Sequence, residues 1–135
     1  MKLLALTFRQ MVQAARAEVP GLKPDEARKK IEDMPNTLVI DVQDAPDAGA
    51  CGLIPGSINI TLGMLPIRAD LELPEAFRAP ELSDRTRPVV TTCGAGGQAA
   101  LAAQLLKRMG FDDVAFIDGG TPAWKAMGFS VESPA

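Results

Sequence analysis

The chain contains no histidine and no tyrosine, and its 135 residues include only two cysteines, Cys51 and Cys93. Without imidazole, a Ser-His-Asp or Cys-His catalytic arrangement is excluded, and so is a His-ligated metal site. Two thiols cannot complete a four-thiolate zinc site either. The sequence therefore predicts no metal site and no cofactor, and any nucleophile must be activated without imidazole.

Positive charge is also scarce, because 14 Lys and Arg face 17 Asp and Glu for a net charge of -3. Nucleic acids and anionic membranes reward clustered positive charge, so neither is expected as a partner. No apolar run approaches the about 20 residues of a membrane span. The run at residues 3–6 is shorter than the about 7–15 apolar residues of a signal peptide. A cytoplasmic protein with reduced thiols is expected, and its oligomeric state stays open.

The order of predicted elements indicates the fold class. At 47% hydrophobic and 23% charged, the chain is suited to one domain with a buried core. Strand patterns cover 37–42, 57–60, 88–92 and 114–117, and helical patterns cover 7–19, 24–34, 99–109 and 121–127. Residues 43–56 are predicted to be a loop, and 62–87 an irregular excursion with at most one short helix near 75–78. The alternation predicts an α/β domain with a central, mainly parallel sheet flanked by helices. Residues 1–23 would be a helical extension packed on a domain formed by 24–135.

The most informative segment is the glycine-rich run that follows the strand 88–92. It starts at Cys93 and includes Gly94, Gly96 and Gly97 before the helix begins. Ligands gather at the carboxyl ends of strands in such sheets. Successive N–H groups in a glycine-rich loop, together with the helix N-terminus, would favour a thiolate without imidazole. The alternative is a glycine-rich turn, with or without a bound phosphate, in which Cys93 is merely buried.

Several ordered pieces of the chain resemble the rhodanese-like sulfurtransferase family, over about residues 24–130. Residues 38–42 and 52–60 are similar to its first signature, and 89–97 to its active-site strand and loop. Residues 109–111 and 118–124 are similar to its closing signature. The resemblance implies a three-layer α/β domain in which Cys93 takes a sulfane sulfur from a donor such as thiosulfate, mercaptopyruvate or a persulfide. The resulting persulfide would pass that sulfur to cyanide or a thiol.

The resemblance also implies roles for the loop. Peptide N–H groups would hold the anionic persulfide; the residues concerned are Gly94, Ala95, Gly96, Gly97, Gln98 and Ala99. Asp41, at the end of a neighbouring strand, would shape the loop by hydrogen bonding, or it is a solvent-facing cap of the strand end.

The chain departs from the family pattern in charge. Gln43 stands where the first signature has Arg, Leu53 replaces its His, and the loop carries no Arg or Lys. Weak thiosulfate affinity is therefore predicted unless Arg68 or Lys125 supplies a cation. Each of these side chains is more often a solvated surface charge. The competing hypothesis is a catalytically weak or silent rhodanese-type binding or regulatory module.

Two further readings concern reactivity. Phosphatases of similar topology need the motif Cys-x5-Arg. With Cys93 as the cysteine, the position of the arginine is occupied by Ala99, so phosphatase activity is not expected. Cys51 is either an ordinary loop cysteine, the favoured reading, or a resolving thiol that attacks the Cys93 persulfide.

Overall fold

The computed structural model describes residues 5–134, which form a parallel sheet between two layers of helices. The strand order is β1-β5-β4-β2-β3, and each adjacent pair is parallel. The strands are β1 (Gly21–Leu22), β2 (Leu38–Asp41), β3 (Ile58–Asn59), β4 (Val89–Thr92) and β5 (Val114–Ile117). The fold class predicted from the sequence, an α/β domain with a parallel central sheet, is confirmed.

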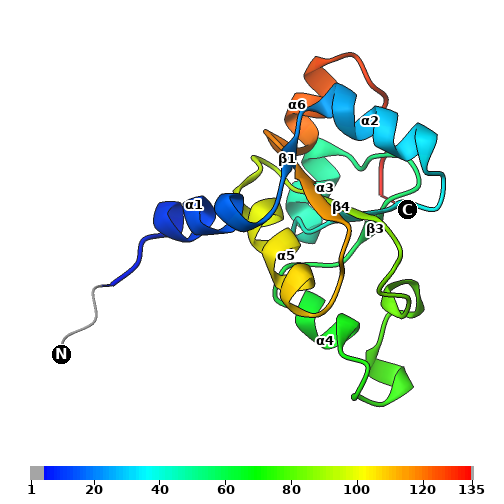
Figure 1. Ribbon diagram of the computed structural model, residues 1–135. Helices are drawn as coiled ribbons and strands as arrows, with labels where there is room; N and C mark the ends of the chain where they lie inside the picture. The colour runs from blue at the N-terminus through cyan, green and yellow to red at the C-terminus, as the bar shows by residue number, and fades with distance from the viewer. Residues whose placement is uncertain (1–4, 135) are drawn as a thin grey trace.

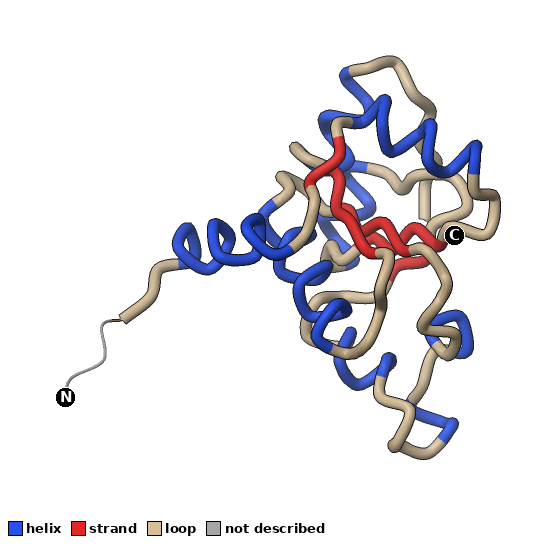
Figure 2. The backbone as a smooth tube through the Cα atoms, in the orientation of Figure 1, coloured by secondary structure: helices blue, strands red, loops and turns tan. Residues whose placement is uncertain are grey.

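Helices cover both faces of the sheet, as Figures 1 and 2 show. The helices are α1 (Phe8–Glu18), α2 (Pro24–Asp33), α3 (Ala45–Cys51), α4 (Leu65–Ala69), α5 (Gly97–Arg108) and α6 (Gly120–Ala126), with 3-10 turns η1 (Glu75–Phe77) and η2 (Pro80–Leu82). In Figure 1, α2 and α6 lie above the sheet, α4 and α5 lie below it, and α1 extends from the side next to α5. Among the described residues, no helix is long and apolar enough to cross a membrane.

Alternation along the strands explains why their sequences are almost continuously apolar. In β2, Leu38 and Ile40 pack with α1, α4 and α5, whereas Val39 packs against the layer that holds α2 and α6. Phe116 and Ile117 divide in the same way in β5. A parallel sheet buried on both faces favours apolar side chains on both sides of each strand. The carboxyl ends of these strands then lie together at one edge of the sheet.

Two local predictions were wrong, and one strand was missed. The segment predicted as a loop contains α3, because Pro46 falls in its first turn, where a missing N–H is tolerated, and Ala48 is buried. Gly52 ends that helix with a φ of 87°. The irregular excursion contains α4 as well as η1 and η2. The two-residue strand β1, which pairs with β5, had no sequence signal of its own.

Other boundaries shifted by a residue or two. Thr7, where the predicted helical pattern 7–19 begins, is the N-cap of α1, since its side chain accepts from the Gln10 N–H. Helix α5 begins at Gly97, two residues earlier than predicted, and so reaches further into the glycine-rich run. The division of the chain after residue 23 stays a prediction, and β1 shows that the first 23 residues contribute a strand to the sheet.

Candidate active site

Cys93 lies directly after β4, at the carboxyl edge of the sheet and ahead of α5. Its side chain is 2% exposed, and its Sγ accepts two main-chain hydrogen bonds. The Gly96 N–H donates at 2.9 Å and the Ala99 N–H at 3.3 Å. Both donors belong to the start of α5, where the helix dipole also favours negative charge. The arrangement stabilises an anionic sulfur with peptide groups alone.

The loop after Cys93 is closed by a tight backbone turn and a side-chain tie. Gly96 has a φ of 99°, a conformation that disfavours any residue with a Cβ. The Thr91 hydroxyl donates to the Ala99 carbonyl at 2.7 Å, which ties the first turn of α5 to β4. These contacts fix the direction in which the two N–H groups meet the sulfur.

A second glycine turn supports the loop from outside. The Thr121 N–H donates to the Cys93 carbonyl at 2.8 Å. Gly120 has a φ of 67°, and a Cβ there would lie 2.2 Å from the Cys93 carbonyl oxygen and 3.1 Å from the Gly96 nitrogen. The first residue of α6 therefore packs directly on the backbone that aims the donors at Sγ.

Asp41 is fully buried, so it is not a solvent-facing cap of the strand. Its two carboxylate oxygens accept from the backbone N–H and the side-chain amide of Gln43, each at 2.9 Å. Burial raises the pKa of the Asp41 carboxyl above its ordinary value of 3.8, and the two Gln43 donors oppose that rise. Gln43, in the position of the family's Arg, thus pairs with this carboxyl but adds no positive charge.

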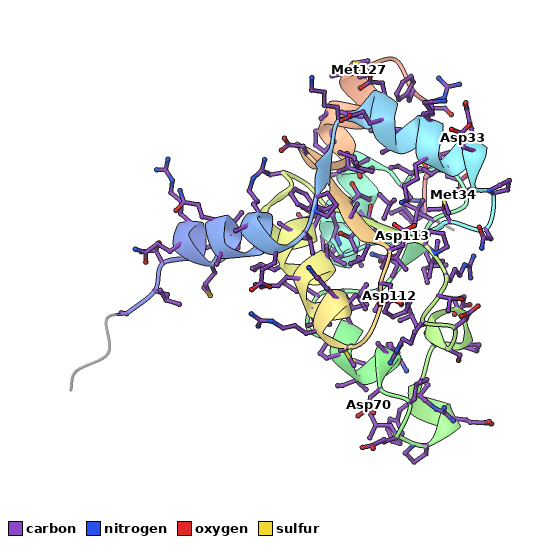
Figure 3. The ribbon with its side chains drawn as sticks, viewed as in Figure 1. Asp33, Met34, Asp70, Asp112, Asp113 and Met127 are labelled. Atoms are coloured by element: carbon purple, nitrogen blue, oxygen red, sulfur yellow. The ribbon has the colours of Figure 1, made fainter. Side chains whose placement is uncertain are left out.

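A pocket of about 250 Å³ opens over Cys93. It is lined by Phe8, Gln43, Asp47, Cys93, Gly94, Ala95, Gly97 and Gln98. Asp47, in the first turn of α3, is the one charged residue of that lining, and no Lys or Arg contributes to it. Outside the pocket, the acidic pair Asp112 and Asp113 precedes β5 and so lies at the other edge of the sheet (Figure 3). The pocket lining therefore carries one negative charge and no positive charge.

The two cations considered from the sequence make other contacts. The Arg68 guanidinium, in α4, donates to the Phe77 carbonyl at 2.9 Å and does not line the pocket. Asp70, which follows α4, is labelled in Figure 3 at the end of the domain opposite to Met127. Lys125 donates to the Cys51 carbonyl at 3.1 Å and also stays outside the pocket lining.

Cys51 is the last residue of α3, partly buried and not disulfide-bonded. Burial raises the pKa of its thiol above the ordinary value of 9.0, and the charge of Lys125 partly offsets that rise. This thiol is consequently a weak nucleophile near neutral pH. Within residues 5–134 no three Cys, Asp or Glu side chains gather as metal ligands.

Sequence reasoning missed two pocket residues, Phe8 and Asp47. Phe8 lies within the helical pattern predicted over 7–19, but no pattern indicated that this helix lies against Gly97. Asp47 was assigned to a loop, so it had no predicted direction. Both residues reach the pocket through tertiary packing rather than through a motif.

The fold and this cysteine loop define a class, and the comparisons agree: the chain belongs to the rhodanese-like family, whose domain model matches residues 23–127. Over 85 residues it is 33% identical to the Schizosaccharomyces pombe protein named "Probable 3-mercaptopyruvate sulfurtransferase". That alignment covers 58% of this chain and only 28% of the yeast protein.

Two solved structures are similar over nearly the whole chain. A Rhodopseudomonas palustris protein of unknown function, described as a "possible tyrosine phosphatase", has a TM-score of 0.87 at 27% identity and covers 98% of both chains. The Wolinella succinogenes polysulfide-sulfur transferase homodimer has a TM-score of 0.74 at 28% identity, over 95% of this chain and 88% of that one. Sulfurtransferases are thus among the relatives, at modest identity.

Proposed function

We propose that the protein is a sulfurtransferase that carries a sulfane sulfur as a persulfide on Cys93. The observation that carries the proposal is the pair of N–H donors, from Gly96 and Ala99, aimed at a buried Sγ that faces a pocket. Such donors stabilise the Cys93 thiolate that attacks the sulfur donor and that is restored when the sulfur leaves, and they need no proton shuttle. That property matches a chain without histidine.

The reaction divides into two displacements at sulfur. With thiosulfate as donor, the Cys93 thiolate attacks the outer sulfur, a new S–S bond forms, and sulfite leaves with the bonding electron pair. The acceptor, cyanide or a thiolate, then attacks the outer sulfur of the persulfide and restores the Cys93 thiolate. A low-molecular-weight persulfide would react in the same way, with its thiolate as the leaving group. With mercaptopyruvate, the C–S bond to the attacked sulfur would break, and pyruvate would leave as its enolate and take up the proton that the transferred sulfur releases. Gly94, Ala95, Gly97 and Gln98 line the pocket into which the outer sulfur would extend.

The structure supports this function better than phosphate-ester hydrolysis. A Cys-x5-Arg phosphatase grips its oxyanion with a bidentate Arg. In this chain, Ala99 contributes only its N–H to Sγ, and the pocket lining contains no Arg. The description of the Rhodopseudomonas palustris protein therefore does not extend to this chain.

Mass spectrometry of the intact protein tests the proposal. Incubation with thiosulfate, mercaptopyruvate or a low-molecular-weight persulfide should add one sulfur, about 32 Da, to the wild type and to Cys51→Ser, but not to Cys93→Ser. Cyanide should remove the added mass and release thiocyanate. Absence of the adduct with all three donors would favour a silent binding or regulatory module. The cytoplasmic location expected from the sequence remains a separate prediction, which cell fractionation tests.

A further inference from the structure

The pocket over Cys93 has a wall that lies outside the residues matched by the family model. Phe8, the first residue of α1, lines the pocket, whereas the family match begins at residue 23. A Cβ on Gly97 would lie 2.9 Å from the Phe8 ring and 3.5 Å from Val12. Helix α1 thus packs directly on the first turn of α5, the turn that follows the Cys93 loop.

A cap at the start of α1 orders the first turn that carries Phe8, and an ion pair near its end attaches the helix to the domain. At its start, the Thr7 hydroxyl accepts from the Gln10 N–H at 3.1 Å, and the Gln10 side chain accepts from the Thr7 N–H at 2.9 Å. Towards its end, Arg16 donates to both carboxylate oxygens of Asp118, at 3.0 and 3.2 Å. The helix is therefore positioned against the domain while the Phe8 side chain stays 54% exposed.

An exposed aromatic ring at the mouth of a nucleophile's pocket offers apolar area to whatever enters. The rest of the lining reinforces that chemistry, since Gln43 and Gln98 are neutral and Asp47 is the single charged residue. A doubly charged donor would meet a carboxylate and find no lysine or arginine in the lining. A donor with an uncharged apolar group would cover the Phe8 ring and avoid that repulsion.

We propose that Phe8 is a specificity-determining residue that selects organic persulfides with an uncharged apolar group, rather than thiosulfate, as sulfur donors to Cys93. The inference rests on the proposed function. In the transfer step, the Cys93 thiolate attacks the outer sulfur of R–S–SH and the new S–S bond forms. The donor's own S–S bond breaks with its electron pair on R–S, which takes up the proton that the transferred sulfur releases. The products are R–SH and the anionic Cys93 persulfide.

The test compares three donors: benzyl persulfide, methyl persulfide and thiosulfate. Benzyl and methyl persulfide have the same reacting atoms, and only the benzyl group is large enough to cover the Phe8 ring. The rate of sulfur addition to Cys93 is followed by intact-protein mass at several donor concentrations. Wild type, Phe8→Ala, Phe8→Leu and the matched control Met11→Ala are compared. Met11 is on the same helix and partly exposed, but it does not line the pocket.

Wild type should react with benzyl persulfide most efficiently and with thiosulfate least. Phe8→Ala should lower kcat/KM for benzyl persulfide about tenfold, the worth of one aromatic contact, and change methyl persulfide less than twofold. Phe8→Leu should restore part of the loss, and Met11→Ala should leave all three donors unchanged. Asp47→Asn should raise the thiosulfate rate several-fold.

Equal losses for benzyl and methyl persulfide in Phe8→Ala, or no loss at all, would overturn the selection by Phe8 while leaving the sulfurtransferase intact. A thiosulfate rate in the wild type above that for benzyl persulfide would also overturn it. If no donor adds sulfur to wild-type Cys93, the proposed function itself fails. That result differs from the two outcomes that would overturn only the selection by Phe8. Circular dichroism of each variant separates a change of donor preference from a loss of fold.

Discussion

Substitution of Gly120 by Ala tests how strongly the start of α6 controls the conformation of the cysteine loop. An added Cβ would lie 2.2 Å from the Cys93 carbonyl oxygen, against the 3.0 Å below which Cβ atoms are essentially never found. One of the two backbone segments must therefore retreat by ~0.8 Å. Because the same Cβ would lie 3.1 Å from the Gly96 nitrogen, the retreat also displaces a donor to the Cys93 sulfur.

The expected magnitude separates into two contributions. A φ of 67° in a residue with a Cβ costs about 1–2 kcal/mol of unfolding free energy. Forcing backbone against backbone adds about 1–3 kcal/mol. Gly128→Ala is the matched control, since Gly128 has a φ of 86° and nothing within 4 Å of its Cβ position. It should show only the first contribution.

Thermal and urea unfolding measure the two variants. At roughly 4 °C per kcal/mol for a domain of this size, Gly128→Ala should lower Tm by about 4–8 °C and Gly120→Ala by about 8–20 °C. Alkylation of Cys93 by iodoacetamide at pH 7 should slow about tenfold in Gly120→Ala and stay unchanged in Gly128→Ala. Equal effects of the two substitutions on Tm and on alkylation would refute the role assigned to the contact between Gly120 and Cys93.

Three further predictions concern the buried carboxyl and the groups around the site. Burial raises the pKa of Asp41 in the folded state above its ordinary value of 3.8. The free energy of unfolding of the wild type should therefore increase relative to that of Asp41→Asn as the pH falls from neutral to 3.8, and it should show no further relative gain below that pH. Urea unfolding from about pH 3.5 to about pH 7 measures this gain in stability, with the exposed Asp44→Asn as control. A stability difference between wild type and Asp41→Asn that does not change with pH would contradict the prediction. Since burial also raises the pKa of Cys51, alkylation of this thiol in Cys93→Ser should accelerate only in alkaline solution. Mild oxidation of the wild type should leave two free thiols, whereas a disulfide between Cys51 and Cys93 would establish the resolving role. Arg68→Ala should leave KM for thiosulfate unchanged, because its guanidinium contacts the Phe77 carbonyl, and a raised KM in a steady-state assay would return Arg68 to the site.

The sheet and the position of Cys93 were predictable because local signals carry them. Leu38 to Ile40 with Val42, and Val89 with Val90, are apolar at neighbouring positions, which is the pattern of a parallel strand buried on both faces. The glycines after Cys93 then mark the strand-to-helix turn without help from distant residues. Because these signals are local, the hydrophobic periodicity and the family resemblance both indicated the loop at Cys93.

The pocket walls were not predictable in this way. Phe8 reaches Gly97 only because α1 packs along α5, a contact between residues about 90 positions apart in the chain. Helix α3 was hidden by Pro46 and Gly49, which are typical of loops but are tolerated in the first turn and on the exposed side of a short helix. The neutral pairing of Gln43 with Asp41 depended on burial, which the sequence pattern does not report.

The hydrogen bonds to the Cys93 sulfur come from main-chain N–H groups, and that origin has an evolutionary consequence. A main-chain donor is present whatever side chain stands at its position, provided that the residue is not proline and the backbone path is kept. Mutations at exposed loop positions such as Ala95 and Gln98 can therefore accumulate without deleting a donor. The glycines that set the backbone path are the sensitive positions. The hydrogen bonds to the sulfur should therefore tolerate substitutions in the loop but not at Gly96 or Gly120.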